Sequence, residues 1–141
     1  MLDKVKEWLD RMQLSYAFNK ERRVFLLPYD IDGVKFSVLI IVFPEKWIKI
    51  AALILEKDKV NESVYKTLLK ANWDLFEVTY SLDPEGNVVS ENDITFDSNF
   101  ENFQSEFNAV VFGVVHFFEE IAPKLQITKE PTYKADKSYW V

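Results

Sequence analysis

Residues 34–55, VKFSVLIIVFPEKWIKIAALIL, decide the fold, because they form two apolar runs joined by Pro44, Glu45 and Lys46. Strict alternation predicts two strands, each with two distinct faces. One face carries Val34, Phe36, Val38, Ile40 and Val42 on the first strand and Ile48, Ile50, Ala52 and Ile54 on the second. The other face begins polar, at Lys35 and Ser37, and becomes apolar from Leu39, with Leu53 and Leu55 on the returning strand. We therefore expect a buried β-hairpin that needs cover on both sides.

The charges inside this stretch exclude a membrane span, because Glu45, Lys46 and Lys49 fall near its middle, where the bilayer cost is highest. The N-terminus, MLDKVKEWLD, is charged and amphipathic and lacks the apolar core of a secretory signal. We expect a protein of the cytoplasm that does not bind membranes.

Composition indicates one ordered domain. The chain has 141 residues, of which 48% are hydrophobic and 16% aromatic, and this length suits a single core. Cysteine is absent, which excludes disulfides, thiolate nucleophiles and thiolate metal sites. The net charge of −6 argues against nucleic-acid binding, which depends on neutralising phosphates.

The segment before the hairpin predicts a helix and a smaller hairpin. Leu2, Val5, Leu9 and Met12 recur at helical spacing, and this helix should end near Gln13. Residues 15–19 and 24–27 then favour two short strands around a polar break.

The segment after the hairpin predicts a helix and two further strands. Asn61 suits the N-cap of a helix that ends near Asn72. Residues 75–82 alternate as a strand, residues 83–87 form an acidic turn, and a last strand extends from Val88 to about Ile94 or Phe96.

A long helix closes the predicted domain. Ser98 and Glu101 have the spacing of a capping box, and Pro123 should stop the helix after about Ala122. Its core stripe consists of Phe100, Phe103, Phe107, Val110, Val114, Phe117 and Ile121.

This last helix carries more apolar surface than one sheet face can cover. The excess consists of Val111, Phe112, Val115 and Phe118. We expect these four side chains, with Tyr139 and Trp140 of the tail, to form a partner-binding surface. An ordinary buried helix beneath an acidic rim explains the pattern equally well, and packing of the tail on its own domain is the simpler use of Tyr139 and Trp140.

Charge is distributed unevenly along the chain. Residues 71–123 contain no Lys or Arg, but they contain the acids Asp74, Glu77, Asp83, Glu85, Glu91, Asp93, Asp97, Glu101, Glu106, Glu119 and Glu120. A surface in this half should favour basic or apolar partners.

No pattern for catalysis, metal or cofactor binding stands out. His116 is the single histidine, no Gly-x-Ser-x-Gly occurs, and three scattered glycines do not make a phosphate loop. Asp30, Asp32 and Gly33 resemble the opening of a metal loop, but its later oxygen ligands are missing. We expect a non-enzyme without a cofactor or a metal site.

The order of elements resembles the type III secretion chaperone-like fold, including its YbjN-like branch. The local likeness is a helix ending at Asn, a strand, an acidic Gly turn and another strand, carried by Leu68, Leu69, Asn72, Phe76, Leu82, Asp83, Gly86 and Val88. The resemblance implies a small acidic protein, often dimeric, that holds partner segments on its surface without chemistry. The polar tail after Pro123 goes beyond the family pattern.

We therefore predict an α+β domain over residues 1–123, with an antiparallel sheet of about five strands and three helices in the order α-β-β-β-α-β-β-α. Residues 124–141 form a tail that packs on the domain or on a second subunit. The predicted function is a non-enzymatic, chaperone-like or regulatory protein-binding module that forms a homodimer. The alternative is a small-ligand-binding domain or enzyme, with a pocket between sheet and last helix lined by Phe103, Phe107 and Trp47.

Overall fold

The computed structural model describes residues 2–44 and 46–127. The elements are α1 (Leu2–Arg11), β1 (Ala17–Asn19), β2 (Val24–Ile31), β3 (Val34–Val42), β4 (Trp47–Leu55), α2 (Glu62–Asp74), β5 (Tyr80–Leu82), β6 (Val88–Thr95) and α3 (Phe100–His116). A short 3-10 turn, Lys57–Lys59, precedes α2, and α3 continues as a π-helical segment, Phe117–Ile121, and a 3-10 turn, Ala122–Leu125. This is the α+β fold expected from the sequence, with six strands in place of about five.

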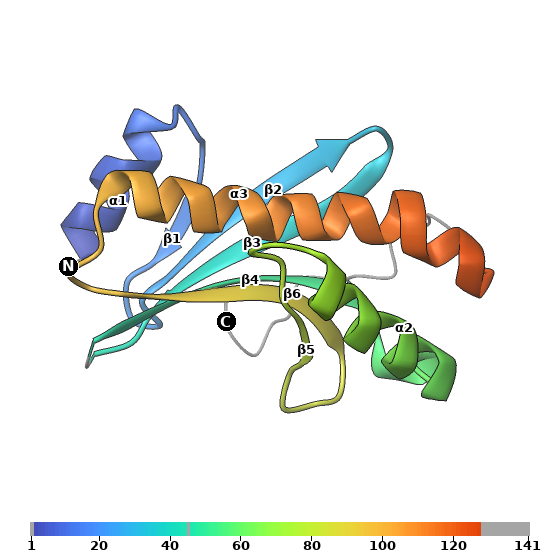
Figure 1. Ribbon diagram of the computed structural model, residues 1–141. Helices are drawn as coiled ribbons and strands as arrows, with labels where there is room; N and C mark the ends of the chain where they lie inside the picture. The colour runs from blue at the N-terminus through green and yellow to red at the C-terminus, as the bar shows by residue number, and fades with distance from the viewer. Residues whose placement is uncertain (1, 45, 128–141) are drawn as a thin grey trace.

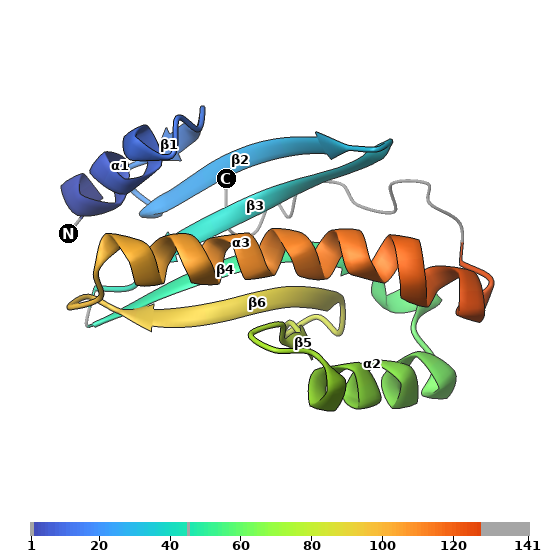
Figure 2. The ribbon, with the colours of Figure 1, turned by 45° about the horizontal axis from the view of Figure 1, so that its top comes forward.

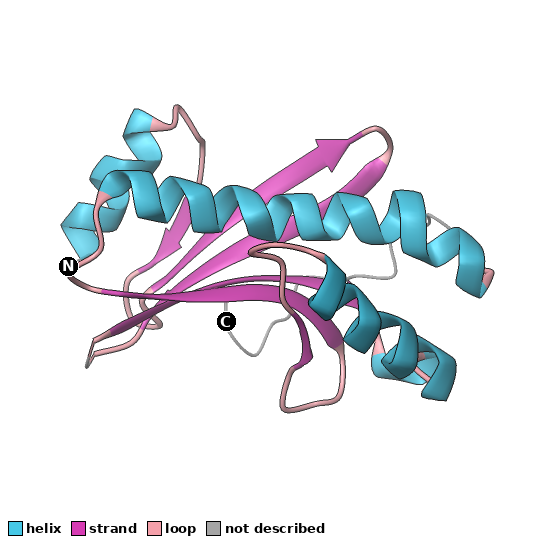
Figure 3. Cartoon of the chain, in the orientation of Figure 1, coloured by secondary structure: helices cyan, strands magenta, loops and turns pink. Residues whose placement is uncertain are grey.

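The six strands form one antiparallel sheet in the order β1-β2-β3-β4-β6-β5. Helix α3 runs along one side of this sheet. Helix α1 lies on the same side, beside the N-terminal end of α3 (Figures 1 and 3). Helix α2 lies at the edge of the sheet that β6 and β5 form (Figure 2). The result is a two-layer domain with its helices on one side.

The central hairpin has the faces that alternation predicts. Ile40 lies opposite Ile50, and Leu39 lies opposite Ala51. The core face, which carries Ile40 and Ile50, belongs to the main apolar cluster together with side chains from all three helices. We call the opposite side the second face; it carries Val24, Leu26, Leu39, Ile41, Lys49, Ala51, Leu53, Val89, Glu91 and Asp93. A bulge between Leu53 and Leu55 changes the expected alternation, so that Ile54 and Leu55 both join the core.

Helix α3 approaches the sheet closely at Gly113. A Cβ at this position would lie 2.5 Å from Ser90 Oγ on β6, so only glycine allows this approach. Ser90 Oγ donates a 3.0 Å hydrogen bond to the Val110 carbonyl, and Asn92 Nδ2 donates to the Glu106 carbonyl at 3.2 Å. Polar side chains of β6 therefore fix the helix along its length. At its N-terminal end, Phe103 stacks on Trp8 of α1 with ring centroids 4.8 Å apart.

The strand expected over residues 75–82 is much shorter in the structure. Helix α2 continues to Asp74, and Glu77 has a positive φ of 64°, which interrupts extended backbone before β5 begins at Tyr80. The Asn72 side chain accepts a hydrogen bond from Tyr80 N–H at 2.8 Å and donates one to the Tyr80 carbonyl at 3.0 Å. Asn72 thus joins α2 to β5, as a strand neighbour would.

The last helix also differs from expectation at both ends. It begins one residue later than Ser98 suggests, because the Asn99 side chain is the N-cap and accepts a hydrogen bond from Asn102 N–H. Its regular part ends at His116, and the chain then continues in the π-helical segment. Pro123 lies within the 3-10 turn that follows, so the helical path ends after Leu125.

Candidate protein-binding surface

The sequence-predicted surface on α3 is only partly present. Phe112 is 53% exposed and stacks on His116, with ring centroids 5.5 Å apart. Val111 and Val115 are half-buried beside it. These three residues form what we call the α3 flank. Tyr139 and Trp140, the two candidate residues of the tail, lie outside the described residues.

Phe118 does not belong to this surface, in contrast to the expectation from a regular helix. It is 4% exposed and packs edge-on against Phe117 at 5.1 Å, inside the main core. Both residues lie in the π-helical segment, where one extra residue per turn changes the direction of each side chain. Two successive phenylalanines can therefore be buried together.

A larger apolar surface lies on α2, where sequence reasoning did not place one. Tyr65, Leu69 and Trp73 are spaced four residues apart and so share one face of the helix. They are 41%, 69% and 89% exposed, and Phe76, just beyond the helix, is 93% exposed. We call these four residues the α2 stripe. A stripe of this size left in water is typical of an interaction surface.

The composition of α2 contains a signal for this stripe. Val64 and Leu68 form one apolar row and are buried against the core, whereas Tyr65 and Leu69 form a second row, one residue later. One residue corresponds to a rotation of about 100° around a helix. A helix at the edge of a domain cannot bury both rows, so one of them has to face outward.

The second face of the sheet forms a third apolar region. Val24, Leu39 and Ile41 form a cluster of their own, separate from the main core, with Leu26 packed against it. A cavity of about 360 Å³ lies over this face. Leu39, Ile41 and Leu53 contribute to its floor, and Leu82 and Pro84 of the β5–β6 hairpin contribute a wall.

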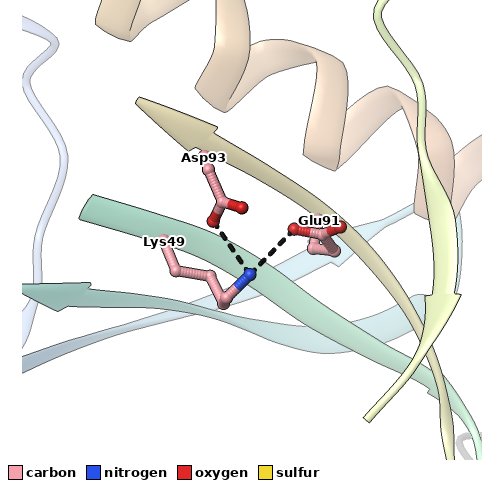
Figure 4. Close-up of polar contacts among 3 residues, drawn as sticks. All are labelled: Lys49, Glu91 and Asp93. Carbon is pink, nitrogen blue, oxygen red and sulfur yellow. Dashed lines mark hydrogen bonds and ion pairs between the residues drawn. The ribbon is translucent and has the colours of Figure 1, made fainter. Parts of the chain in front are cut away.

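A charged cluster of Lys49, Glu91 and Asp93 borders this cavity, because Lys49 and Glu91 line it. Figure 4 shows the three side chains. Lys49 Nζ lies 2.8 Å from Asp93 Oδ1 and 3.1 Å from Glu91 Oε2. Burial lowers the pKa of the Lys49 ammonium, but its hydrogen bonds to Asp93 and Glu91 outweigh burial and raise the pKa above its ordinary value. The cluster holds two carboxylates against one ammonium, so its formal charge is negative.

The pocket expected between the sheet and the last helix is not built from the three residues assigned to it. Phe103 and Phe107 are fully buried on the core face. Trp47 lies on the other side of β4, where it lines a separate cavity of about 580 Å³ with Phe43 and Pro44. The three side chains therefore do not share a pocket.

The acidic turn between β5 and β6 has a structural role. Asp83 accepts hydrogen bonds from the N–H groups of Glu85 and Asn87, both at 2.9 Å, and so closes the β5–β6 turn. Within residues 2–44 and 46–127, no three His, Asp or Glu side chains lie close enough together to hold a metal ion. No helix in the same part of the chain has the length and apolar character to cross a bilayer.

A protein-family model matches almost the whole chain. The model of the CesT_Tir_1 family, a type III secretion chaperone family, matches residues 1–124, and the chain belongs to this family. A search of curated proteins finds no match.

Solved structures share the fold. YbjN from E. coli superposes with a TM-score of 0.65 at 19% identity, over 89% of this chain and 93% of that one. The ExsC–ExsE complex contains a chain that superposes with a TM-score of 0.57 at 17% identity, over 82% of this chain and 89% of that one. The Yersinia pestis type III secretion chaperone SycH, in complex with a fragment of YscM2, superposes with a TM-score of 0.52 at 16% identity. The match covers 80% of this chain and 95% of that one.

Proposed function

We propose that this protein is a non-enzymatic, chaperone-like module of the cytoplasm that binds segments of other protein chains through exposed apolar side chains. The observation that carries the proposal is the exposure of apolar side chains on two helices: Phe112 of the α3 flank is 53% exposed, and Leu69, Trp73 and Phe76 of the α2 stripe are each more than two thirds exposed. Family membership supports the same class of function. Among the structural neighbours, SycH was solved in complex with a fragment of YscM2 and SchA as a complex with the effector HopA1.

The proposal includes a homodimer in which the α2 stripes of two copies pack together. A stripe along one helix can meet its own copy across a two-fold axis, and every residue is then used on both sides. Charge does not oppose this pairing, because residues 57–77, which contain the whole stripe, have four lysines (57, 59, 66 and 70) against four acids (58, 62, 74 and 77). The α2 end is thus free of the acidic excess that makes two copies repel each other elsewhere.

The α3 flank is the proposed site for the partner segment. Phe112 supplies an exposed apolar anchor, with Val111 and Val115 on either side. Glu101, Glu119 and Glu120 lie exposed along the same helical path, and no Lys or Arg occurs in residues 71–123. This surface favours a segment that combines apolar and basic residues, because the acids attract it and repel acidic competitors.

Sedimentation equilibrium tests the dimer. The wild-type chain should sediment at twice its mass of 16.6 kDa, and the double variant Leu69→Ser/Trp73→Ser should sediment as a folded monomer. Trp47→Ser is the matched control, since it removes a half-exposed tryptophan from the other side of the molecule and should leave the dimer intact. A wild-type monomer at every concentration would contradict the dimer.

Fluorescence anisotropy tests the partner site separately. The probe is a labelled synthetic peptide of alternating leucine and lysine, compared with its leucine and glutamate counterpart. The basic peptide should bind, Phe112→Ser should weaken it by about tenfold, equivalent to about 1.4 kcal/mol, and the α2 double variant should bind as the wild type does. Equal affinity for both peptides would reject the proposed selectivity.

A further inference from the structure

The second face of the sheet carries apolar side chains that the helices do not cover. Leu39, Ile41 and Leu53 line the cavity over this face, whereas α1, α2 and α3 all pack into the cluster on the core face. A sheet face in contact with water is normally polar and accessible. The apolar composition of this face favours a cover in addition to the three helices and to the wall that Leu82 and Pro84 contribute.

We propose that the C-terminal segment of the same chain, residues 128–141, is the occupant of the second face. This inference goes beyond the proposed function, because it assigns an intramolecular ligand to a surface that neither the dimer nor the partner site uses.

The point at which the described chain ends supports this assignment. The Ile127 N–H donates a 2.9 Å hydrogen bond to the Ala122 carbonyl, and Gln126 has a left-handed φ of 58° that reverses the chain. Residues 124–127 line a small cavity with Lys59 and Asn61, which belong to the connection between β4 and α2. The segment therefore starts close to the connection between β4 and α2.

The length of the segment is sufficient. Residues 128–141 are fourteen residues, which span up to about 46 Å when fully extended. Crossing the second face from β6 to β2 requires about 15 Å, because neighbouring strands lie about 4.8 Å apart. The segment can cross all four strands with length to spare.

The chemistry of the segment also suits the surface. Its larger apolar residues are Tyr133, Tyr139, Trp140 and Val141, and aromatic side chains bury a large area for each residue that is ordered. It contains three lysines, at 129, 134 and 137, against Glu130 and Asp136. This positive excess complements the Lys49, Glu91 and Asp93 cluster, whose two carboxylates share one ammonium.

Paramagnetic relaxation tests the proposal in the full-length chain. The protein has no cysteine, so Ser138→Cys provides a single attachment site for a nitroxide. Methyl signals of Leu39, Ile41 and Leu53 should lose more than half of their intensity, whereas those of Val5 and Leu9, buried between α1 and the core face, should keep theirs. Absence of broadening, or broadening that does not distinguish the two faces, would overturn the proposal.

Three further samples identify the source of the effect. In a mixture of spin-labelled, unenriched chains with isotope-labelled chains that lack the nitroxide, the broadening should disappear; if it persists there, the occupant is the tail of a second copy and the proposal fails. Tyr139→Ser/Trp140→Ser should restore the methyl signals of the labelled chain. Trp73→Ser, which removes an aromatic from the α2 stripe, should leave the broadening unchanged.

Discussion

The Tyr80 hydroxyl donates a 2.6 Å hydrogen bond to the Gly113 carbonyl, which joins β5 to the middle of α3. Both groups are buried, and the bond spans 33 positions of sequence. Because Tyr80 N–H and C=O are both bonded to Asn72, one strand residue connects α2, the sheet and α3. Removing any of these bonds should therefore loosen the contact between both helices and the β5 end of the sheet.

Tyr80→Phe should lower the free energy of unfolding by about 1 kcal/mol, since it removes one buried hydrogen bond and leaves the ring packing in place. The Gly113 carbonyl keeps a second donor, the Phe117 N–H, which limits the loss. Urea denaturation measures the change. Tyr65→Phe, on the exposed side of α2, should change stability by less than about 0.5 kcal/mol, and an equal loss in both variants would contradict the role of the Tyr80 bond.

Alkaline pH should destabilise the protein partly through Tyr80. Burial raises the pKa of its phenol well above the ordinary value. The folded state holds this proton where the unfolded state releases it, so the stabilisation is complete below about pH 10 and decreases as pH rises further. Tyr80→Phe should show a smaller loss of stability between neutral and alkaline pH than the wild type, measured by urea denaturation at each pH. Parallel pH curves for the two proteins would refute this.

Gly113→Ala should destabilise the protein although alanine favours helix. The new Cβ would lie 2.5 Å from Ser90 Oγ and 3.1 Å from Val78 Cγ1. Overpacking of this kind costs about 1–3 kcal/mol, more than the gain of about 1 kcal/mol in helix propensity. Ser90→Ala removes the closest atom, so the double variant should lose less stability than the sum of the single variants, as a double-mutant cycle measures. Additive losses would show that the two residues do not compete for space.

Asn72→Ala should cost about 1–3 kcal/mol, because it leaves the backbone groups of Tyr80 without the two hydrogen bonds that replace a strand neighbour. Hydrogen exchange offers a local measurement, since the Tyr80 amide should exchange faster in the variant while the Ile50 amide of the central strand keeps its protection. Asn108→Ala, on the exposed side of α3, is the matched control. Unchanged exchange at Tyr80 would show that Asn72 does not hold β5.

The central hairpin could be predicted from sequence because alternation alone assigns its faces. Ile40 and Leu39 differ by one position and lie on opposite sides of the sheet, and one register satisfies both strands. The core stripe of α3 was predictable for the same reason, since Phe103, Phe107, Val110 and Val114 are all buried.

The candidate site was harder to predict, because its outcome depends on tertiary contacts. Helix α2 has two apolar rows, and only the position of the sheet decides that Leu68 is buried while Leu69 is exposed. On a regular helix Phe118 would face the surface, whereas the π-helical segment buries it. Periodicity cannot reveal where a helix changes its winding.

Lys49→Met should destabilise the protein in a salt-dependent way. Without the ammonium, Glu91 and Asp93 repel each other on neighbouring positions of β6, and this repulsion weakens as salt screens it. For a partly exposed network of this kind the expected loss is about 1 kcal/mol at low salt. Lys66→Met is the matched control, since Lys66 pairs with Glu62 in an exposed i,i+4 pair worth about 0.4 kcal/mol. In urea denaturation, the free energies of unfolding of the two variants should lie closer together at high salt than at low salt. A Lys49→Met loss that is independent of salt would indicate that the side chain contributes packing rather than charge.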